Sequence, residues 1–302
     1  MKTLLVKTLL LKTLLVGLLM MVVAGVVWAG EAVDKTLAVK PDGLVRIENV
    51  RGRIDVEGWE RSDVRVVGTL DDQAKSLTFE TSGSTTTVKV ETPDNLGRGK
   101  GSDLVIHVPT TSRVRVEVVS ADLVLQNLHG GIDAQTVSGG IDGSDLGGRI
   151  ELATVSGHVD VTHADGAMTF NSVSGNIKAE TDAEQLRITT VSGGANVRSG
   201  KRVKEMTLNS VSGDIDFSGD LADGARVKGA TTSGDVRLAV NRDAGAVVEL
   251  RTTAGGAIKN TLTSDRAQRS MAGGEELEVT MGDGAGSIEL TTVSGRLELS
   301  PR

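Results

Sequence analysis

The strongest constraint on the fold is a seven-residue motif that the chain repeats five times in succession. The copies TVSGGID, TVSGHVD, SVSGNIK, TVSGGAN and SVSGDID begin at Thr136, Thr154, Ser172, Thr190 and Ser210. Their first four glycines, Gly139 to Gly193, are 18 residues apart, and Gly213, Gly234, Gly255 and Gly295 continue the series at wider spacing. Such self-similarity is typical of a solenoid, in which each turn buries its apolar face only against neighbouring turns.

Apolar residues occupy fixed positions relative to each motif glycine. They lie seven, five and two residues before it, and two and four residues after it. Most of these positions alternate with polar ones, which is the pattern of a β-strand with one buried face. The set two residues before the glycine is assigned to the interior with the others, and contains Val119, Val137, Val155, Val173, Val191, Val211 and Val293. Stacked about 4.8 Å apart, these files would form the core of a parallel β-solenoid.

The remaining motif positions have structural explanations. We expect the glycine to supply a positive φ angle where the strand bends. The hydroxyl residues three positions before it, such as Thr136 and Ser172, are expected to hydrogen-bond from turn to turn. The serine directly before it is expected to cap the bend. No histidine or lysine stands at a fixed offset to activate these serines as nucleophiles, so no catalytic role is assigned to them.

The first 29 residues read as a secretory signal peptide. Lys2, Lys7 and Lys12 precede an apolar run from Leu14 to Trp28, and small residues flank a cleavage point after Ala29. The run is shorter than the ~20 residues of a membrane-spanning helix, so we expect cleavage and no membrane insertion of the mature chain. Removing the three lysines of residues 1–29 takes the net charge from −7 to −10, which argues against nucleic acid as a partner. The predicted location is the periplasm or the cell surface.

Residues 30–302 are expected to form a single all-β domain. Its main turns would cover 114–300, and the non-repeating segment 59–113 would be a β-meander cap near the N-terminal end. Within the cap, Leu77–Glu91 is predicted as a hairpin and Asp103–Pro109 as a strand. Residues 260–276 are predicted to be a polar loop inserted between turns. Right-handed coiling is expected, because parallel crossover connections strongly prefer it.

Two groups of polar residues invite a metal interpretation. His158, Asp160, His163 and Asp165 lie close together in HVDVTHAD, but strand alternation places His158 and Asp160 outward and the other two in the next bend. Asp142 and Asp160 share a column and would stack as like charges, so a weak Ca²⁺ contact there is a hypothesis. A solvated surface explains both groups better, and no metal ligand, cofactor or catalytic residue is predicted.

Some β-helices are carbohydrate-active enzymes, and this remains the alternative function. Phe170 and Phe217 fall on core columns, which leaves Trp59 as the aromatic residue best placed for exposure. No spacing singles out a catalytic carboxylate pair. The sequence therefore favours a protein that is not an enzyme.

The chain resembles a family known as the exported bacterial "putative adhesin" domain of unknown function. The resemblance rests on the opening VRIENVRGRIDVEGW, the series of T/S-V-S-G-D/N-I turns, and the closing AVVELRTTAGGAI and GSIELTTVSGRLEL, and it covers residues 43–300. It implies a β-solenoid on an exported protein with a role in adhesion or envelope organisation. The expected partner is a protein or glycan of the cell envelope. Self-association end to end through open solenoid edges, as a structural element of the envelope, is a third hypothesis.

Overall fold

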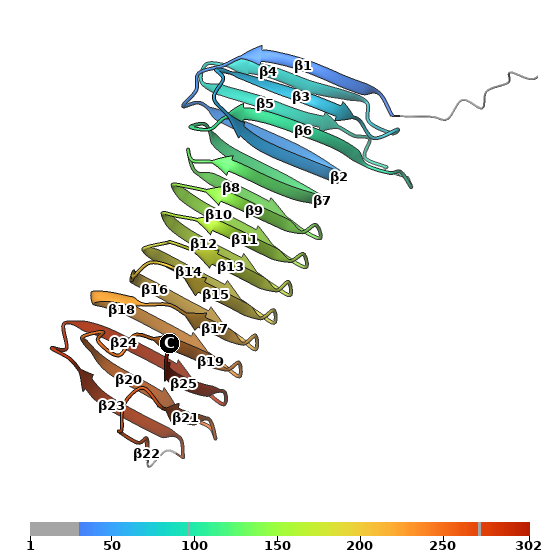
Figure 1. Ribbon diagram of the computed structural model, residues 1–302. Helices are drawn as coiled ribbons and strands as arrows, with labels where there is room; N and C mark the ends of the chain where they lie inside the picture. Colours follow the sequence, from blue (N-terminus) through green and yellow to red (C-terminus); the bar gives the residue numbers. More distant parts are fainter. Residues whose placement is uncertain (1–29, 96, 271–272) are drawn as a thin grey trace, which may run out of the picture.

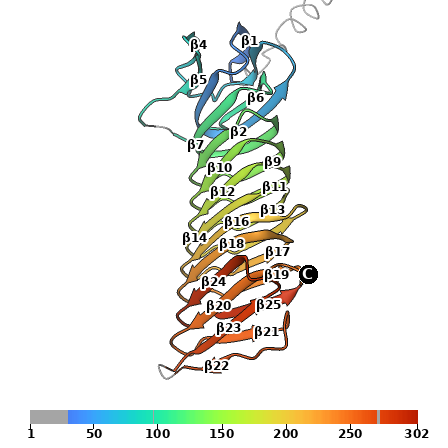
Figure 2. The same cartoon turned by 90° about the vertical axis from the view of Figure 1, so that its left-hand side faces the viewer.

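The computed structural model describes residues 30–95, 97–270 and 273–302, and these ranges contain β-strands and no helix. Their 25 strands belong to one long sheet that coils into a rod (Figures 1 and 2). The predicted all-β, mostly parallel solenoid is confirmed. The predicted signal peptide lies outside the described residues. Across the described part of the chain no helix could cross a membrane.

The regular part of the rod consists of turns with two strands each. The first strands of these turns are β8 (Ile132–Thr136), β10 (Arg149–Thr154), β12 (Ala167–Ser172), β14 (Gln185–Thr190), β16 (Val203–Ser210) and β18 (Leu221–Thr231). The second strands are β9 (Ile141–Leu146), β11 (Val159–Ala164), β13 (Ile177–Thr181), β15 (Ala195–Ser199), β17 (Ile215–Ser218) and β19 (Val236–Val240). Each strand pairs in parallel with the strand one turn away.

The predicted 18-residue register is confirmed in the strand pairing. Ile132 is the partner of Ile150, Ile150 of Met168, and Met168 of Leu186. All four side chains are buried, as are Phe170 and Phe217 on the neighbouring columns. Like residues therefore cover one another along the axis, and the core is one continuous aliphatic column with few aromatic rings.

At the N-terminal end, the first turn lies one layer inside the rod. That turn is β2 (Leu44–Trp59), which pairs in parallel with β7 (Arg113–Leu128) on one side. On its other side β2 pairs with β5 (Thr85–Glu91) and β6 (Ser102–Pro109). Three antiparallel strands complete this cap, namely β1 (Ala32–Ala38), β3 (Asp63–Thr69) and β4 (Ser76–Ser82). The expected β4–β5 hairpin and β6 strand are present, whereas β1 was not anticipated.

A buried ion pair ties this cap to the first turn. The Arg51 guanidinium on β2 binds both carboxylate oxygens of Asp71, whose side chain is 2% exposed. The same guanidinium donates to the carbonyl oxygen of Gly97 at 2.5 Å, and the Asp71 amide donates to Ser102 Oγ at 2.9 Å. The hydrogen bonds from Arg51 and from the Gln73 amide to the Asp71 carboxylate, above all the one from Arg51, hold the pKa of Asp71 well below the ordinary carboxyl value.

At the C-terminal end, the order of turns in space departs from their order in the sequence. The last turn, β24 (Gly286–Thr292) and β25 (Arg296–Pro301), lies between β18–β19 and the turn formed by β20 (Ala246–Thr252) and β21 (Ala257–Asn260). Beyond it, β23 (Glu275–Met281) pairs antiparallel with β20, and β22 (Gln268–Arg269) with β23. The chain thus runs to the outermost layer and then returns to form the turn of β24 and β25 one layer inside (Figure 1).

Two expectations for this end were wrong. Part of the segment 260–276, expected to be a polar loop, belongs to β22 and β23, since an outermost turn gains hydrogen bonds by pairing its free edge. The turn after β20 also holds one extra residue, with Gly255 at φ +79°. Ile258, rather than the predicted Ala257, therefore lies opposite Leu297.

Candidate functional site

The hydroxyl residues of the repeated motif lie inside the bends. Thr136, Thr154 and Ser172 are 4–5% exposed. Thr136 Oγ1 accepts from the Gly139 amide at 3.0 Å, whereas Ser172 Oγ donates to the Gly175 carbonyl oxygen at 2.6 Å. These bonds close the bend within its own turn, so the expected bonding from turn to turn was wrong at these positions.

The motif glycines are required by close approach between turns. A Cβ on Gly157 would lie 1.8 Å from the carbonyl oxygen of Gly139, and one on Gly175 would lie 1.7 Å from that of Gly157. None of these three glycines has a positive φ. The expectation of a left-handed bend was therefore wrong at these positions, and the absence of a side chain is what the stack requires.

The valines of the motif form one file, but on the outside of the rod. The Val137 amide donates to the Val119 carbonyl oxygen at 3.2 Å, which places successive valines one above the other. Their exposed fractions are 39–48%, so their assignment to the interior was wrong. The reason is parity: the positions seven, five and three before the glycine alternate inward, which turns the position two before it outward.

The motif serines follow the valines and are exposed as well. Ser212 Oγ donates to the Val191 carbonyl oxygen of the preceding turn at 3.1 Å, and Ser233 Oγ to that of Val211 at 3.3 Å. They link neighbouring turns instead of capping their own bend. We call this edge of the rod the valine–serine corner, and it consists of Val119, Val137, Val155, Val173, Val191, Val211 and Val293, each with the serine that follows it.

A groove of about 860 Å³ runs beside the valine–serine corner. Its far wall is a column of outward-facing residues without charge, namely Gln135, Ala153, Asn171 and Thr189. Val90 and Thr92 of the cap close one end, where the charged residues Glu48, Lys89, Glu91 and Glu117 gather. The groove is thus apolar and uncharged along most of its length and charged only where it meets the cap.

The opposite edge of the rod is charged. His129, Asp145, His163 and Asp165 line a second hollow of about 440 Å³ there. His129 Nε2 lies 3.3 Å from Asp145 Oδ1, and both side chains are about half exposed or more. Asp145 and His163 have positive φ angles of 54° and 52°, which makes this edge a series of left-handed bends. No group of three or more His, Cys, Asp or Glu side chains in the described ranges is arranged to hold a metal ion.

The stacked carboxylates that suggested a Ca²⁺ contact each have a protein partner. Asp142 Oδ1 lies 3.2 Å from His158 Nε2, and Asp160 Oδ2 lies 3.1 Å from Lys178 Nζ. The two carboxylates belong to adjacent turns and are direct strand partners. Neighbouring side chains of the next turn therefore lie beside both carboxylates, at the positions where the Ca²⁺ hypothesis placed a cation.

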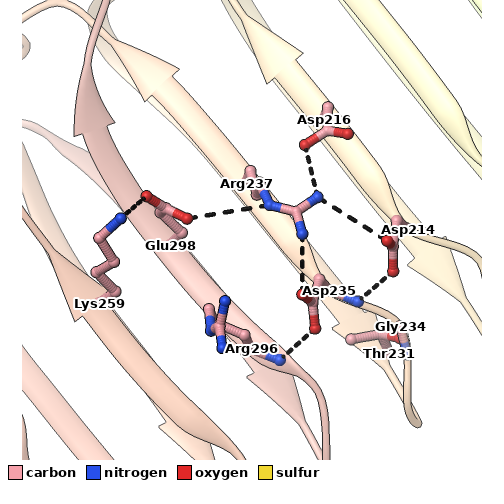
Figure 3. A network of polar contacts seen from close by, with 9 residues as sticks. All are labelled: Asp214, Asp216, Thr231, Gly234, Asp235, Arg237, Lys259, Arg296 and Glu298. Atoms are coloured by element: carbon pink, nitrogen blue, oxygen red, sulfur yellow. Dashed lines mark hydrogen bonds and ion pairs between the residues drawn. The ribbon is translucent and has the colours of Figure 1, made fainter.

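A network around Arg237 joins the inserted last turn to its neighbours (Figure 3). The guanidinium lies 3.0 Å from Asp216 Oδ1 and 3.0 Å from Asp235 Oδ2. It also lies 3.9 Å from Glu298, which Lys259 Nζ approaches to 2.6 Å. The hydrogen bond that the Arg237 guanidinium donates to Asp216 raises the pKa of Arg237 further. The carboxylates are paired with these cations, so the network holds neighbouring turns together.

The aromatic residue considered as a sugar platform is already engaged. Trp59 stacks on His107 with ring centroids 4.9 Å apart, and the Arg61 guanidinium lies 4.9 Å from its ring centre. Its indole N–H donates to the Asp63 carbonyl oxygen at 2.9 Å. The Trp59 side chain thus belongs to the packing of the cap.

These features define a non-globular class of protein, a β-solenoid with one apolar and one charged edge and with antiparallel strands at both ends. The family model of the Toastrack domain, DUF4097, matches residues 45–300, and the chain belongs to this family. The resemblance noted from the repeats is thereby confirmed. No curated protein matches the chain.

The chain is similar to solved structures of bacterial proteins at low sequence identity. A "putative adhesin" from Parabacteroides distasonis is 12% identical, with 89% of this chain and 97% of that chain covered and a TM-score of 0.44. A "putative lipid binding protein" from the same species is also 12% identical at the same coverage, with a TM-score of 0.42. A "putative adhesin" from Bacteroides fragilis is 9% identical, with 89% and 97% covered and a TM-score of 0.39.

Proposed function

We propose that this protein is an exported, non-enzymatic scaffold of the bacterial cell envelope, adhesin-like in that it acts by contact along the valine–serine corner. One observation carries the proposal. Among the described residues, seven of the eight exposed large hydrophobic side chains lie in that single file. Contiguous apolar surface on a soluble fold marks a contact site for another macromolecule.

The energetics favour contact over exposure. Each valine of the file is about 40% exposed, so covering it would contribute about 1 kcal/mol at the usual value for burying an aliphatic side chain. The file cannot collapse onto itself, because the hydrogen bonds between turns fix the spacing of its backbone. A partner that covers several valines at once gains several of these contributions, less the cost of association.

Export and location complete the proposal. The sequence of residues 1–29 supports a signal peptide, and the predicted mature chain is anionic and lacks cysteine. These features fit a protein of the periplasm or the cell surface whose stability depends on packing.

Co-sedimentation with envelope particles tests the proposal. Residues 30–302, which contain every described strand, would be mixed with purified envelope fragments of the source bacterium and pelleted. We expect the wild-type chain to pellet with the fragments and the variant Val155→Ser/Val173→Ser to lose about tenfold in apparent affinity, because two central apolar contacts are removed.

Val105→Ser is the matched control, since Val105 is 36% exposed but lies on β6, outside the corner. Equal pelleting of the corner variant and the wild type would contradict the proposal. So would the release of reducing ends from a panel of polysaccharides, because it would reveal an enzyme.

A further inference from the structure

We propose that the occupant of the valine–serine corner is the same corner of a second copy of this chain, with the two rods antiparallel about a two-fold axis. The inference rests on the proposed function of the corner as a contact surface. It goes further by naming the partner and its orientation.

The spacing of the file is the first argument. Successive valines are one strand spacing apart, about 4.8 Å along the rod. An extended peptide presents same-face side chains about 6.7 Å apart, so it would lose register with the file after a few residues. A second copy has the same spacing by construction. Its valines therefore meet these valines turn by turn along the whole length, as in the dry interfaces of stacked identical strands.

The open shape of the groove is the second argument. A small ligand or acyl chain is normally enclosed over most of its surface. This groove is bounded on one side by exposed valines and is open along its length, with no lid among the described residues. A long, rigid protein surface covers an open groove of this kind better than an acyl chain does.

The distribution of charge sets the orientation. In the outward column beside the valines, the residues from Gln135 to Thr291 in spatial order carry no charge, namely Gln135, Ala153, Asn171, Thr189, Asn209, Ala230 and Thr291. Glu117 precedes this stretch at the cap end, and Arg251 follows it at the other end. An antiparallel pair brings the acidic cap end of each copy, with Glu48 and Glu117, towards Arg251 of its partner, whereas a parallel pair brings like charges together.

Both end residues keep partners within their own chain. Glu117 Oε1 lies 2.8 Å from Arg115 Nε, and Arg251 Nε lies 2.8 Å from Glu276 Oε1. The contact between copies would extend these ion pairs and would act mainly on orientation, as charges at the rim of an interface do.

The size of the contact agrees with a reversible dimer. From Val119 to Val293 the corner spans eight turns, with Thr232 in the seventh, which is about 34 Å at the spacing of parallel strands. A strip about 20 Å wide would bury about 700 Å² on each copy, close to the ~800 Å² per partner of a standard interface. The midpoint of the eight lies between Val173 and Val191, so Val173 of one copy faces Val191 of the other.

Sedimentation equilibrium of residues 30–302 tests the association. We expect a reversible dimer with a dissociation constant in the micromolar range. Val173→Lys should raise that constant by at least about tenfold, because it places a charge in the centre of an apolar contact. Val105→Lys, the matched control on β6, should leave it unchanged. The milder Val173→Ser should act in the same direction, and circular dichroism would show that each variant keeps its strands.

Cross-linking tests the orientation. The chain has no cysteine, so an introduced cysteine is its only thiol. In an antiparallel pair, Val119→Cys chains mixed with Val293→Cys chains should be joined by a short bis-maleimide, whereas either variant alone should not. Cross-linking of each variant with itself would overturn the antiparallel arrangement.

The failure of this inference is distinguishable from that of the proposed function. A strict monomer at all concentrations overturns the dimer, and so does stoichiometric uptake of palmitate by a monomer, since it would place an acyl chain in the groove. If a monomeric chain still pellets with envelope fragments and corner variants do not, the contact function stands without the dimer. If the dimer forms and corner variants still pellet, the dimer stands and the proposed envelope function fails.

Discussion

At the scale of single residues, neighbouring glycines in the same bend have different tasks. A Cβ on Gly193 would lie 2.0 Å from the carbonyl oxygen of Gly175, because the turns approach most closely there. The nearest atom to a Cβ on Gly194 is Asn176 Oδ1 at 3.7 Å, which is ordinary contact. Two adjacent glycines of the same motif therefore differ in whether the stacking of the turns requires them.

Gly193→Ala should destabilise the fold by about 2–3 kcal/mol, since the added methyl group must push two backbones apart. Gly194→Ala should be neutral, or slightly stabilising through the loss of freedom in the unfolded chain. Urea unfolding of the two variants measures both effects. Equal midpoints would show that close approach of the turns is not the reason for the glycine column.

The buried Arg51–Asp71 pair should make the cap sensitive to acid. Because the folded state lowers the pKa of Asp71, its contribution is complete above the ordinary carboxyl pKa of about 3.9 and is lost as the pH falls through the lower folded value. Asp71→Asn should cost about 3 kcal/mol at neutral pH by leaving Arg51 without its counter-charge. The variant should also lose this part of the acid dependence.

Unfolding midpoints measured between pH 7 and the acid limit would check this prediction. Asp34→Asn is the matched control, since Asp34 also binds an arginine, Arg65, but its side chain is 60% exposed. A surface pair of this kind is screened by solvent, so the control should change the midpoint little. An equal effect of the two variants would contradict the assigned role of burial.

At the scale of elements, the inserted last turn holds the C-terminal end together by pairing with a turn on each side. β24 is hydrogen-bonded to β18 on one side and to β20 on the other, and β25 to β19 and β21. Arg237 on β19 and Lys259 on β21 both contact Glu298 on β25. Without this turn, β18 and β20 would have no strand between them.

Truncation after Gly284 should therefore release β20 to β23 while the regular turns stay folded. In a solenoid each turn depends mainly on its neighbours, so the loss should remain local. Hydrogen exchange would show it: amides of β20 should exchange as in an unfolded chain, and those of β10 to β15 should stay protected. Retained protection of β20 would mean that the outer layer is stable without the inserted turn.

At the scale of the whole molecule, the sequence predicted the coil and its register but not the order of layers at the ends. Columns such as Ile132, Ile150 and Met168 repeat at 18 residues, and periodicity alone places them in the core. The positions of β2 and β24 depend on pairing between segments far apart in the chain, which no local pattern records. The valines of the valine–serine corner were assigned to the interior because they are hydrophobic. The alternation of side chains along the strand would have placed Val137 outward.

The insertion of the last turn has a consequence for the folding of the chain during its synthesis. Residues 286–301 are synthesised after β20 to β23 but lie inside them, so the rod cannot be completed in the order of synthesis. Until residues 286–301 have been synthesised, the strand that belongs between β18 and β20 is missing. A chain without residues 286–301 would leave the parallel edge of β18 unpaired, and proteases cleave such locally unfolded segments more readily.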